Sequence, residues 1–166
     1  MLDKRYQVFI STSGSDMQPE RMVLTQTLVG MGFFSWGLEQ RTPLSTSYAR
    51  SQIDDCDYVV LLLGSQYGEQ SVSGVGYMHL EYIYAVTKQK PMIVFMHEDP
   101  DSRDASLQDA KPELREKFKE FRRLLQQEVD QVFCYRSLRD LELAVRFNMP
   151  QMLERYPVVG WVRPQN

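Results

Sequence analysis

Cysteine and histidine are scarce in this 166-residue chain, which contains two of each. Cys56 and Cys134 stand far apart and form no CxxC pair, so neither a disulfide framework nor a zinc-ribbon site is expected. His79 and His97 do not complete a metal-ligand cluster with them. We therefore predict no metal site and no cofactor, and we interpret the cysteines as two buried thiols of a reducing compartment.

Long hydrophobic runs are also missing. No apolar stretch approaches the roughly 20 residues that a membrane span needs, and residues 1–5 lack the apolar segment of a signal peptide. The formal net charge of −3 argues against a strongly electrostatic partner such as nucleic acid or a membrane, although it does not exclude a local patch. We expect a cytoplasmic protein with neither kind of partner.

The chain does contain a regular alternation of strand and helix patterns. Short runs rich in β-forming residues predict strands at 6–10, 33–38, 58–63, 92–96 and 129–135. Helical spacing of apolar residues predicts helices at about 19–32, 46–55, 77–88, 113–128 and 137–155. The polar segment 97–111 is predicted to be an exposed, mobile loop. The pattern indicates a single α/β domain over 1–166, built on a flavodoxin-like parallel sheet of order 2-1-3-4-5 with helices on both faces.

Two loops rich in small residues follow the first and third predicted strands. In the order 2-1-3-4-5, ligands bind where these two strands end side by side. Neither a Walker A sequence nor a GxGxxG fingerprint is present, but backbone N–H groups at a helix start can hold an anion without a named motif. An ordinary capped loop is the alternative. We predict substrate contacts from Ser11, Thr12, Ser13, Gly14, Asp16, Gly64, Ser65 and Tyr67.

Glu81 is the strongest candidate for a catalytic residue. It falls within the first turns of the helix predicted after the third strand, at the edge where open α/β sheets bind ligands. A carboxylate in a partly closed pocket can stabilise an oxocarbenium-like transition state or attack an anomeric carbon. The alternative is an acidic residue that only favours the start of its helix.

Four further side chains are candidates for the wall of the same site. Arg50 and Glu39 lie near this edge of the sheet in the predicted topology, and Trp36 ends the second strand. Tyr77 opens the helix that carries Glu81 and is a candidate for stacking on a base. For the aromatic residues, packing in the core is the alternative.

Several short segments, read together, resemble a TIR-like domain family whose members often stand at the N-terminus of large bacterial signalling or NTPase proteins. The resemblance covers nearly the whole chain and is specific only as a combination. The matching segments are 4–12, 16–17 with 20–21, 54–58, Gly64 with 67–68, 81–82 with 84–85, 97–100 and 159–163.

This resemblance implies a function as well as a fold. The family is similar to TIR domains, whose enzymatic members cleave the nicotinamide–ribose bond of NAD with a glutamate on the helix after strand three, and to nucleoside 2-deoxyribosyltransferases. Glu81 matches that glutamate by placement. The implied roles are an NAD glycohydrolase or a nucleotide-processing relative in bacterial antiphage defence, with NAD as a substrate, self-association, and effector or C-terminal domains as partners. Many TIR domains are instead non-catalytic assembly modules, in which the loops at 64–76 and 98–110 would form the contacts.

Overall fold

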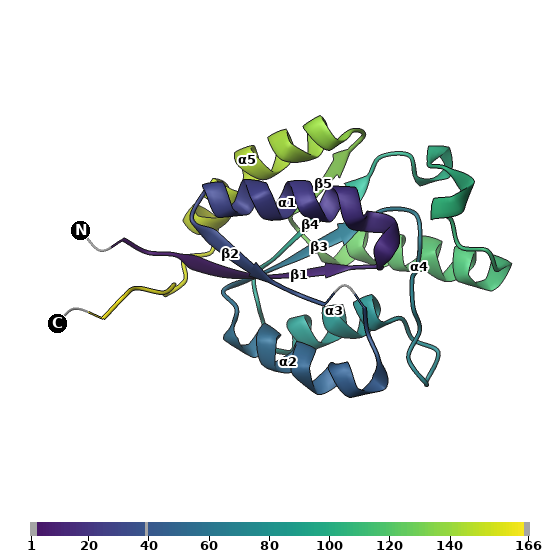
Figure 1. The fold of residues 1–166 in the computed structure, drawn as a ribbon, viewed down its shortest axis with the longest axis horizontal. Helices are drawn as coiled ribbons and strands as arrows, with labels where there is room; N and C mark the ends of the chain where they lie inside the picture. The colour runs from purple at the N-terminus through teal and green to yellow at the C-terminus, as the bar shows by residue number, and fades with distance from the viewer. Residues whose placement is uncertain (1–2, 39, 165–166) are drawn as a thin grey trace.

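The computed structural model describes residues 3–38 and 40–164. Five parallel strands form one sheet of order β2-β1-β3-β4-β5 (Figure 1). The predicted flavodoxin-like order is confirmed, and the carboxyl ends of all five strands lie along one edge. The strands are β1 (Tyr6–Thr12), β2 (Phe33–Trp36), β3 (Tyr58–Leu63), β4 (Met92–His97) and β5 (Val132–Tyr135).

Helices cover both faces of the sheet. On one face, α1 (Gln18–Gly30) packs beside α5 (Leu138–Arg155), and on the other lie α2 (Thr46–Asp55), α3 (Tyr77–Thr87) and α4 (Pro112–Glu128) (Figure 1). Each connection between neighbouring parallel strands therefore crosses over through a helix, as parallel pairing requires. Within the described residues, no helix is long and apolar enough to cross a membrane.

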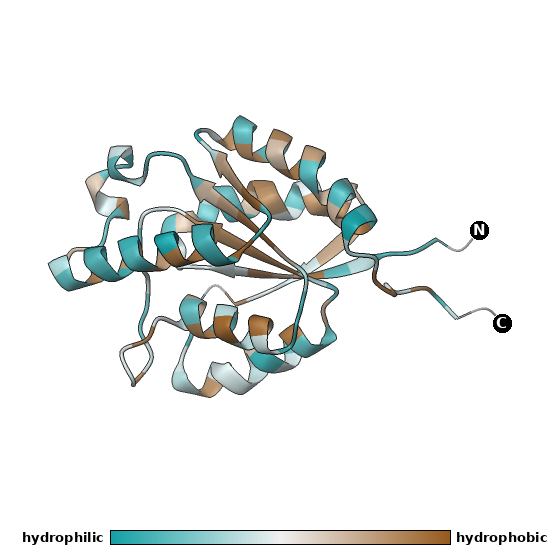
Figure 2. Ribbon diagram, turned by 180° about the vertical axis from the view of Figure 1, so that it is seen from behind, coloured by the Kyte–Doolittle hydropathy of each residue, from teal (hydrophilic) through white to brown (hydrophobic). Residues whose placement is uncertain are grey.

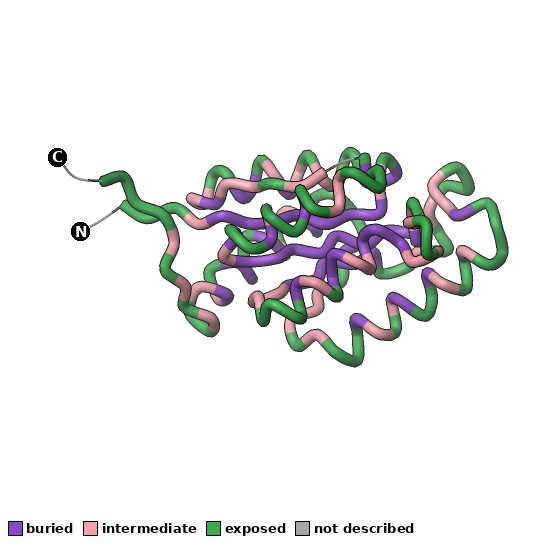
Figure 3. The backbone as a smooth tube through the Cα atoms, turned by 90° about the horizontal axis from the view of Figure 1, so that it is seen from below, coloured by how far each residue is buried: buried purple, intermediate pink, exposed green. Residues whose placement is uncertain are grey.

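The central strand β3 shows why the sheet is apolar throughout. Val60 and Leu62 pack into the cluster beneath α1 and α5, whereas Leu61 and Leu63 pack into the cluster beneath α3 and α4. Side chains alternate between the two faces of a strand, so a sheet covered on both faces needs apolar residues at every position. Figure 2 shows the apolar strands between the helix layers, and Figure 3 shows them buried.

Two of the predicted strand boundaries change the candidate site. β1 continues through Ser11 and Thr12, which pair with Leu61 and Leu62 of β3, so these two residues end a strand rather than start a loop. β2 ends at Trp36 instead of at 38, where Gly37 adopts a φ of 151° that side-chain-bearing residues rarely adopt. The longer β1 places the buried Ser11 side chain near the carboxyl end of the strand.

The segment 97–111 was predicted to be an exposed, mobile loop, and most of its residues are exposed. It contains two 3₁₀ turns, at Pro100–Ser102 and Ala105–Leu107, and it packs against the carboxyl ends of the strands. Asp109 is buried and accepts a hydrogen bond from the Tyr67 backbone N–H at 2.8 Å. Buried polar side chains anchor this segment, and hydropathy alone does not reveal such anchors.

The two cysteines differ in exposure. Cys56 is buried, and burial raises the pKa of its thiol to about 12. Cys134 lies on the edge strand β5 and is exposed, so the expectation of two buried thiols holds only for Cys56.

Candidate active site

Glu81 lies on the second turn of α3, with its side chain turned toward the end of β1. Only 7% of the side chain is exposed, although glutamate is almost never buried without a partner. The Ser11 hydroxyl donates a hydrogen bond to Glu81 Oε1 at 2.6 Å. A strand residue and a helix residue, 70 positions apart in the sequence, thus meet at the predicted switch point of the sheet.

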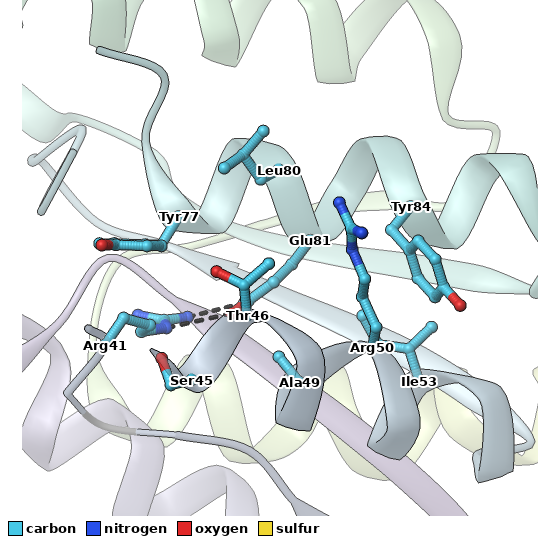
Figure 4. Close-up of a pocket in the computed structure, with 10 residues that line it drawn as sticks. All are labelled: Arg41, Ser45, Thr46, Ala49, Arg50, Ile53, Tyr77, Leu80, Glu81 and Tyr84. Atoms are coloured by element: carbon cyan, nitrogen blue, oxygen red, sulfur yellow. Dashed lines mark hydrogen bonds and ion pairs between the residues drawn. The ribbon is translucent and has the colours of Figure 1, made fainter. Parts of the chain in front are cut away.

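Arg41 supplies the charge that balances Glu81. Its Nη2 donates to Glu81 Oε1 at 2.8 Å and its Nε donates to Oε2 at 3.2 Å, a two-pronged arrangement (Figure 4). Its Nη1 donates to the carbonyl oxygen of Thr12. The Arg41 side chain is only 2% exposed. Such bidentate pairs are the strongest form of the arginine–carboxylate interaction, and this one fixes both Glu81 oxygens.

A small cavity adjoins this ion pair. It holds about 10 Å³, roughly the room that one water molecule needs. The side chains around it come from the turn before α2, from α2 and from α3, and Figure 4 shows Arg41 and Glu81 pointing toward each other within this group. The lining residues are Arg41, Ser45, Thr46, Ala49, Arg50, Ile53, Tyr77, Leu80, Glu81 and Tyr84.

Of the predicted site residues, the structure brings five together here. Ser11 and Thr12 contact Glu81 and Arg41 directly, and Tyr77 and Arg50 line the cavity. The Arg50 guanidinium lies 5.2 Å from the centre of the Tyr84 ring, within the range of a cation–π contact. The cavity therefore combines a carboxylate, a hydroxyl, two guanidinium groups and aromatic surface.

Arg41 was not predicted, although one signal could have identified it. It follows the second strand and directly precedes Thr42-Pro43, the start of the turn that leads into α2. Because Arg41 follows the carboxyl end of β2, it lies at the same edge of the sheet as Glu81. A buried carboxylate at that edge requires a cation, and Arg41 lies in the one loop between β2 and α2.

Four predicted residues form a different cluster, around Arg103. Arg103 donates to Ser65 Oγ at 2.9 Å and to Glu20 Oε2 at 3.0 Å, and it lies 3.5 Å from Asp16 Oδ2. The Ser13 hydroxyl donates to Asp16 at 2.8 Å. A side chain at Gly64 would meet Arg103 Nη1 at 2.2 Å, so this glycine makes room for the arginine. Ser13, Asp16, Gly64 and Ser65 thus anchor the segment 97–111.

Both carboxyl groups of the Arg103 cluster have altered acidity. Burial raises the pKa of Asp16, against the lowering effect of its Ser13 hydrogen bond and of Arg103. Burial also raises the pKa of Glu20, again opposed by Arg103. Burial disfavours the charged form of both carboxyl groups, whereas the guanidinium that they share favours it. Raised pKa values of this kind favour the folded state at acid pH.

The remaining predictions fall elsewhere. Tyr67 packs edge-on against Phe121, and its hydroxyl lies 3.1 Å from His79 Nδ1, away from the Glu81 cavity. Gly14 caps the 3₁₀ turn before α1. Trp36 lines a separate pocket beside β2. Glu39 lies outside the described residues.

Arg103→Leu is expected to lower the free energy of unfolding by about 3–5 kcal/mol at pH 7, because it leaves two buried carboxylates without their counter-charge. The loss should shrink as the pH falls, since Asp16 and Glu20 are then protonated and need no cation. Denaturant unfolding at several pH values measures this. Arg136→Leu is the control: its partner pair with Glu98, at 2.9 Å, is exposed and should contribute at most about 1 kcal/mol. Equal losses in the two variants would contradict the role given to Arg103.

Ser11→Ala is expected to cost about 1.5–3 kcal/mol of stability, the usual contribution of a hydrogen bond to a charged group. The change removes the only hydroxyl that contacts Glu81 Oε1 among the described residues. Thermal or denaturant unfolding measures it, with the exposed Ser47→Ala as a control expected to stay within about 0.5 kcal/mol of wild type. If Ser11→Ala had the same stability as wild type, the hydrogen bond between Ser11 and Glu81 would contribute nothing to folding.

Comparison with known proteins identifies a family and a shared fold. A family model described as "Domain of unknown function (DUF4062)" matches residues 7–150. No curated protein matches the sequence. Among solved structures, the CMP N-glycosidase BcmB of Clostridium botulinum is similar, with a TM-score of 0.57 at 14% sequence identity. The match covers 86% of this chain and 99% of that one. At this identity the likeness concerns the fold.

Proposed function

The chain belongs to the DUF4062 family, and from this premise we propose that it cleaves the N-glycosidic bond of a nucleotide, with Glu81 as the catalytic residue. One observation carries the proposal. A carboxylate that is nearly inaccessible to solvent is held by a hydroxyl and a guanidinium at the switch point of a parallel α/β sheet. A fold gains nothing obvious from burying a charge there, since an apolar pair of similar volume is often at least as stable.

Cleavage of the N-glycosidic bond requires few protein groups besides this carboxylate. As the bond between the base and C1′ breaks, the bond's electron pair leaves with the base and positive charge develops on the ribose ring. Glu81 would stabilise that charge, or attack C1′ to form a covalent ester. Water then adds its hydroxyl to C1′, and the remaining proton is released or taken up by the base. Ser11 would orient Glu81 in both versions.

Substrate entry requires Arg41 to move. Pockets that bind small molecules usually measure about 300–1,000 Å³, whereas the cavity beside Glu81 holds about 10 Å³. An Arg41 side chain that leaves Glu81 would expose the carboxylate and free a fork of donors suited to a phosphate group. Arg50 adds a second cation at the cavity. For this reason we propose a phosphorylated substrate rather than a neutral nucleoside.

The activity of a structurally similar protein supports the cleavage of an N-glycosidic bond as the type of reaction. One solved structure that shares this fold is that of a CMP N-glycosidase. The resemblance to TIR-like domains, in which Glu81 matches the catalytic glutamate by placement, favours NAD as the finer choice of substrate. The same resemblance leads us to propose self-association and a role in bacterial defence signalling, together with effector or C-terminal domains.

A non-catalytic assembly domain is the second candidate, and the closed cavity favours it. In the described conformation Glu81 and Arg41 satisfy each other, as a purely structural ion pair would. Exposed apolar side chains on α1 and α5, among them Met22, Val29 and Phe147, offer a surface for a partner.

Incubation of the purified chain with a panel of substrates separates the two candidates. The panel contains cytidine, CMP, adenosine, AMP and NAD, at high protein concentration so that self-association can occur, and released base is measured by chromatography. We expect base release from the phosphorylated members and little from the nucleosides. Absence of base release from every member would leave the assembly function as the better account.

A further inference from the structure

A second pocket lies on the side of α2 that faces away from Glu81. It holds about 400 Å³, within the range of pockets that bind small molecules. It is bounded by strands β1 and β2, helix α2 and the segment that follows α5. The lining residues are Gln7, Phe34, Trp36, Tyr48, Ser51, Gln52, Asp55 and Trp161. Residues of α2 thus line two separate cavities from its two faces.

Aromatic rings make up half of this lining. Trp36, Tyr48 and Trp161 are each about half exposed, at 46%, 55% and 49%, which is unusual for side chains of this size. Rings that line an open pocket offer flat surfaces on which another flat ring can stack, and each such stack is worth about 1–3 kcal/mol when the ligand is a base. The walls therefore suit a planar ligand.

Several polar groups in the pocket have no side-chain partner in the part of the chain that the structure describes. The Gln52 Oε1 atom is buried and accepts no hydrogen bond. Among the described residues, nothing pairs with the side-chain amide of Gln7 or with the carboxylate of Asp55. A buried acceptor without a donor costs about 1–3 kcal/mol, so a turn of the Gln52 amide toward a ligand that brings N–H groups to this pocket would recover part of that cost.

The combination selects one class of ligand. A quaternary ammonium ion also fits among aromatic rings, but it has no N–H to offer Gln52. A carboxamide side chain pairs its oxygen and its NH₂ with the amino group and ring nitrogen of adenine. None of the eight lining residues is lysine or arginine, in contrast to the Glu81 cavity with Arg41 and Arg50. A phosphate would find no partner here.

We propose that this pocket is a binding site for a purine base that carries an exocyclic amino group, as the free base or as a nucleoside. The base stacks on the aromatic walls, and its donor and acceptor edge meets the amides of Gln7 and Gln52, with Asp55 as a further acceptor. The site is separate from the cavity at Glu81 and does not depend on the function proposed for it.

Tryptophan fluorescence reports on this pocket directly. The chain has two tryptophans, Trp36 and Trp161, and both line it. Titration of the full chain with adenosine should change the emission in a saturable way. Gln52→Leu should weaken binding about tenfold, which corresponds to about 1.4 kcal/mol. Tyr48→Ala, at an exposed position that the fold does not need, should weaken it at least fivefold.

The controls distinguish the purine from other occupants. Gln127→Leu, an exposed glutamine on α4, should bind adenosine as wild type does. Choline should leave the emission unchanged. The proposal is overturned if adenosine gives no saturable change, if choline alone gives one, or if Gln52→Leu and Tyr48→Ala both bind adenosine as tightly as wild type. Circular dichroism of each variant establishes that it is folded.

Discussion

Replacing Arg41 by methionine is expected to lower the free energy of unfolding by about 3–5 kcal/mol at pH 7. Methionine keeps the length of the aliphatic stem but leaves the Glu81 carboxylate buried, with the Ser11 hydroxyl as its one remaining side-chain partner among the described residues. An uncompensated buried charge is among the few causes of so large an effect. Denaturant unfolding followed by circular dichroism measures it.

A double variant shows whether the cost comes from the orphaned charge. In Arg41→Met/Glu81→Leu, an apolar pair of similar volume replaces the ion pair, and the stability should return to within about 1 kcal/mol of wild type or exceed it. Arg146→Met is the control for arginine as such, since its exposed contact with Glu142 spans 3.9 Å. Its stability should change by less than about 1 kcal/mol. A double variant as unstable as Arg41→Met would contradict the ion-pair account.

Replacing Glu81 by glutamine is expected to lower the rate of base release by about 10³-fold or more. The amide keeps the shape of the side chain but carries no negative charge for the developing ribosyl cation, and removal of a single stabilising group typically costs 10²–10³-fold. Loss of a nucleophile costs more. Single-turnover kinetics with protein in excess measures the bond-breaking step without the contribution of product release.

This prediction needs two controls, because Glu81→Gln also leaves the Arg41 guanidinium buried without its counter-charge. The folded fraction must be determined at the assay temperature, and the rate expressed per folded molecule. Glu120→Gln, at an exposed position on α4, should keep the wild-type rate. A folded Glu81→Gln protein that releases base at the rate of wild type would refute the catalytic role.

The fold was predictable because its signals are local and repeated. The apolar run at 58–63 coincides with β3, and the helical pattern at 46–55 coincides with α2. The end of β1 was predicted too early, since Ser11 and Thr12 look like loop residues in the sequence. Their pairing with Leu61 and Leu62 extends the strand, and pairing across a sheet is not visible in one segment alone.

The site was only partly predictable, for a physical reason. Topology places Ser11 and Glu81 at the same edge of the sheet, and the structure joins them. Arg41 and Arg103 were missed because each comes from a loop without periodicity, and each is recognised only by the buried carboxylates that it meets. Gly64 illustrates the consequence: it was predicted to contact a substrate, and the structure places the Arg103 side chain against it instead.

In the proposed enzyme, the closed cavity would restrict the access of a substrate to the Glu81 carboxylate. As long as Arg41 pairs with both oxygens of Glu81, the carboxylate is unavailable to a substrate. An anionic substrate that draws Arg41 away would uncover the catalytic group on binding, because the phosphate replaces the lost partner of the guanidinium. Neutral nucleosides lack this means of entry, and the proposed preference for phosphorylated substrates rests on this difference.

The most direct test compares base release by wild type with that by Arg41→Met/Glu81→Leu, with CMP and NAD as substrates and protein in excess. Both proteins should be fully folded under the assay conditions, so any difference in rate reflects chemistry rather than folding. We expect wild type to release base and the double variant to release none above the uncatalysed rate. Equal rates in the two proteins, or no release by either, would contradict the assignment of this buried ion pair as an active site.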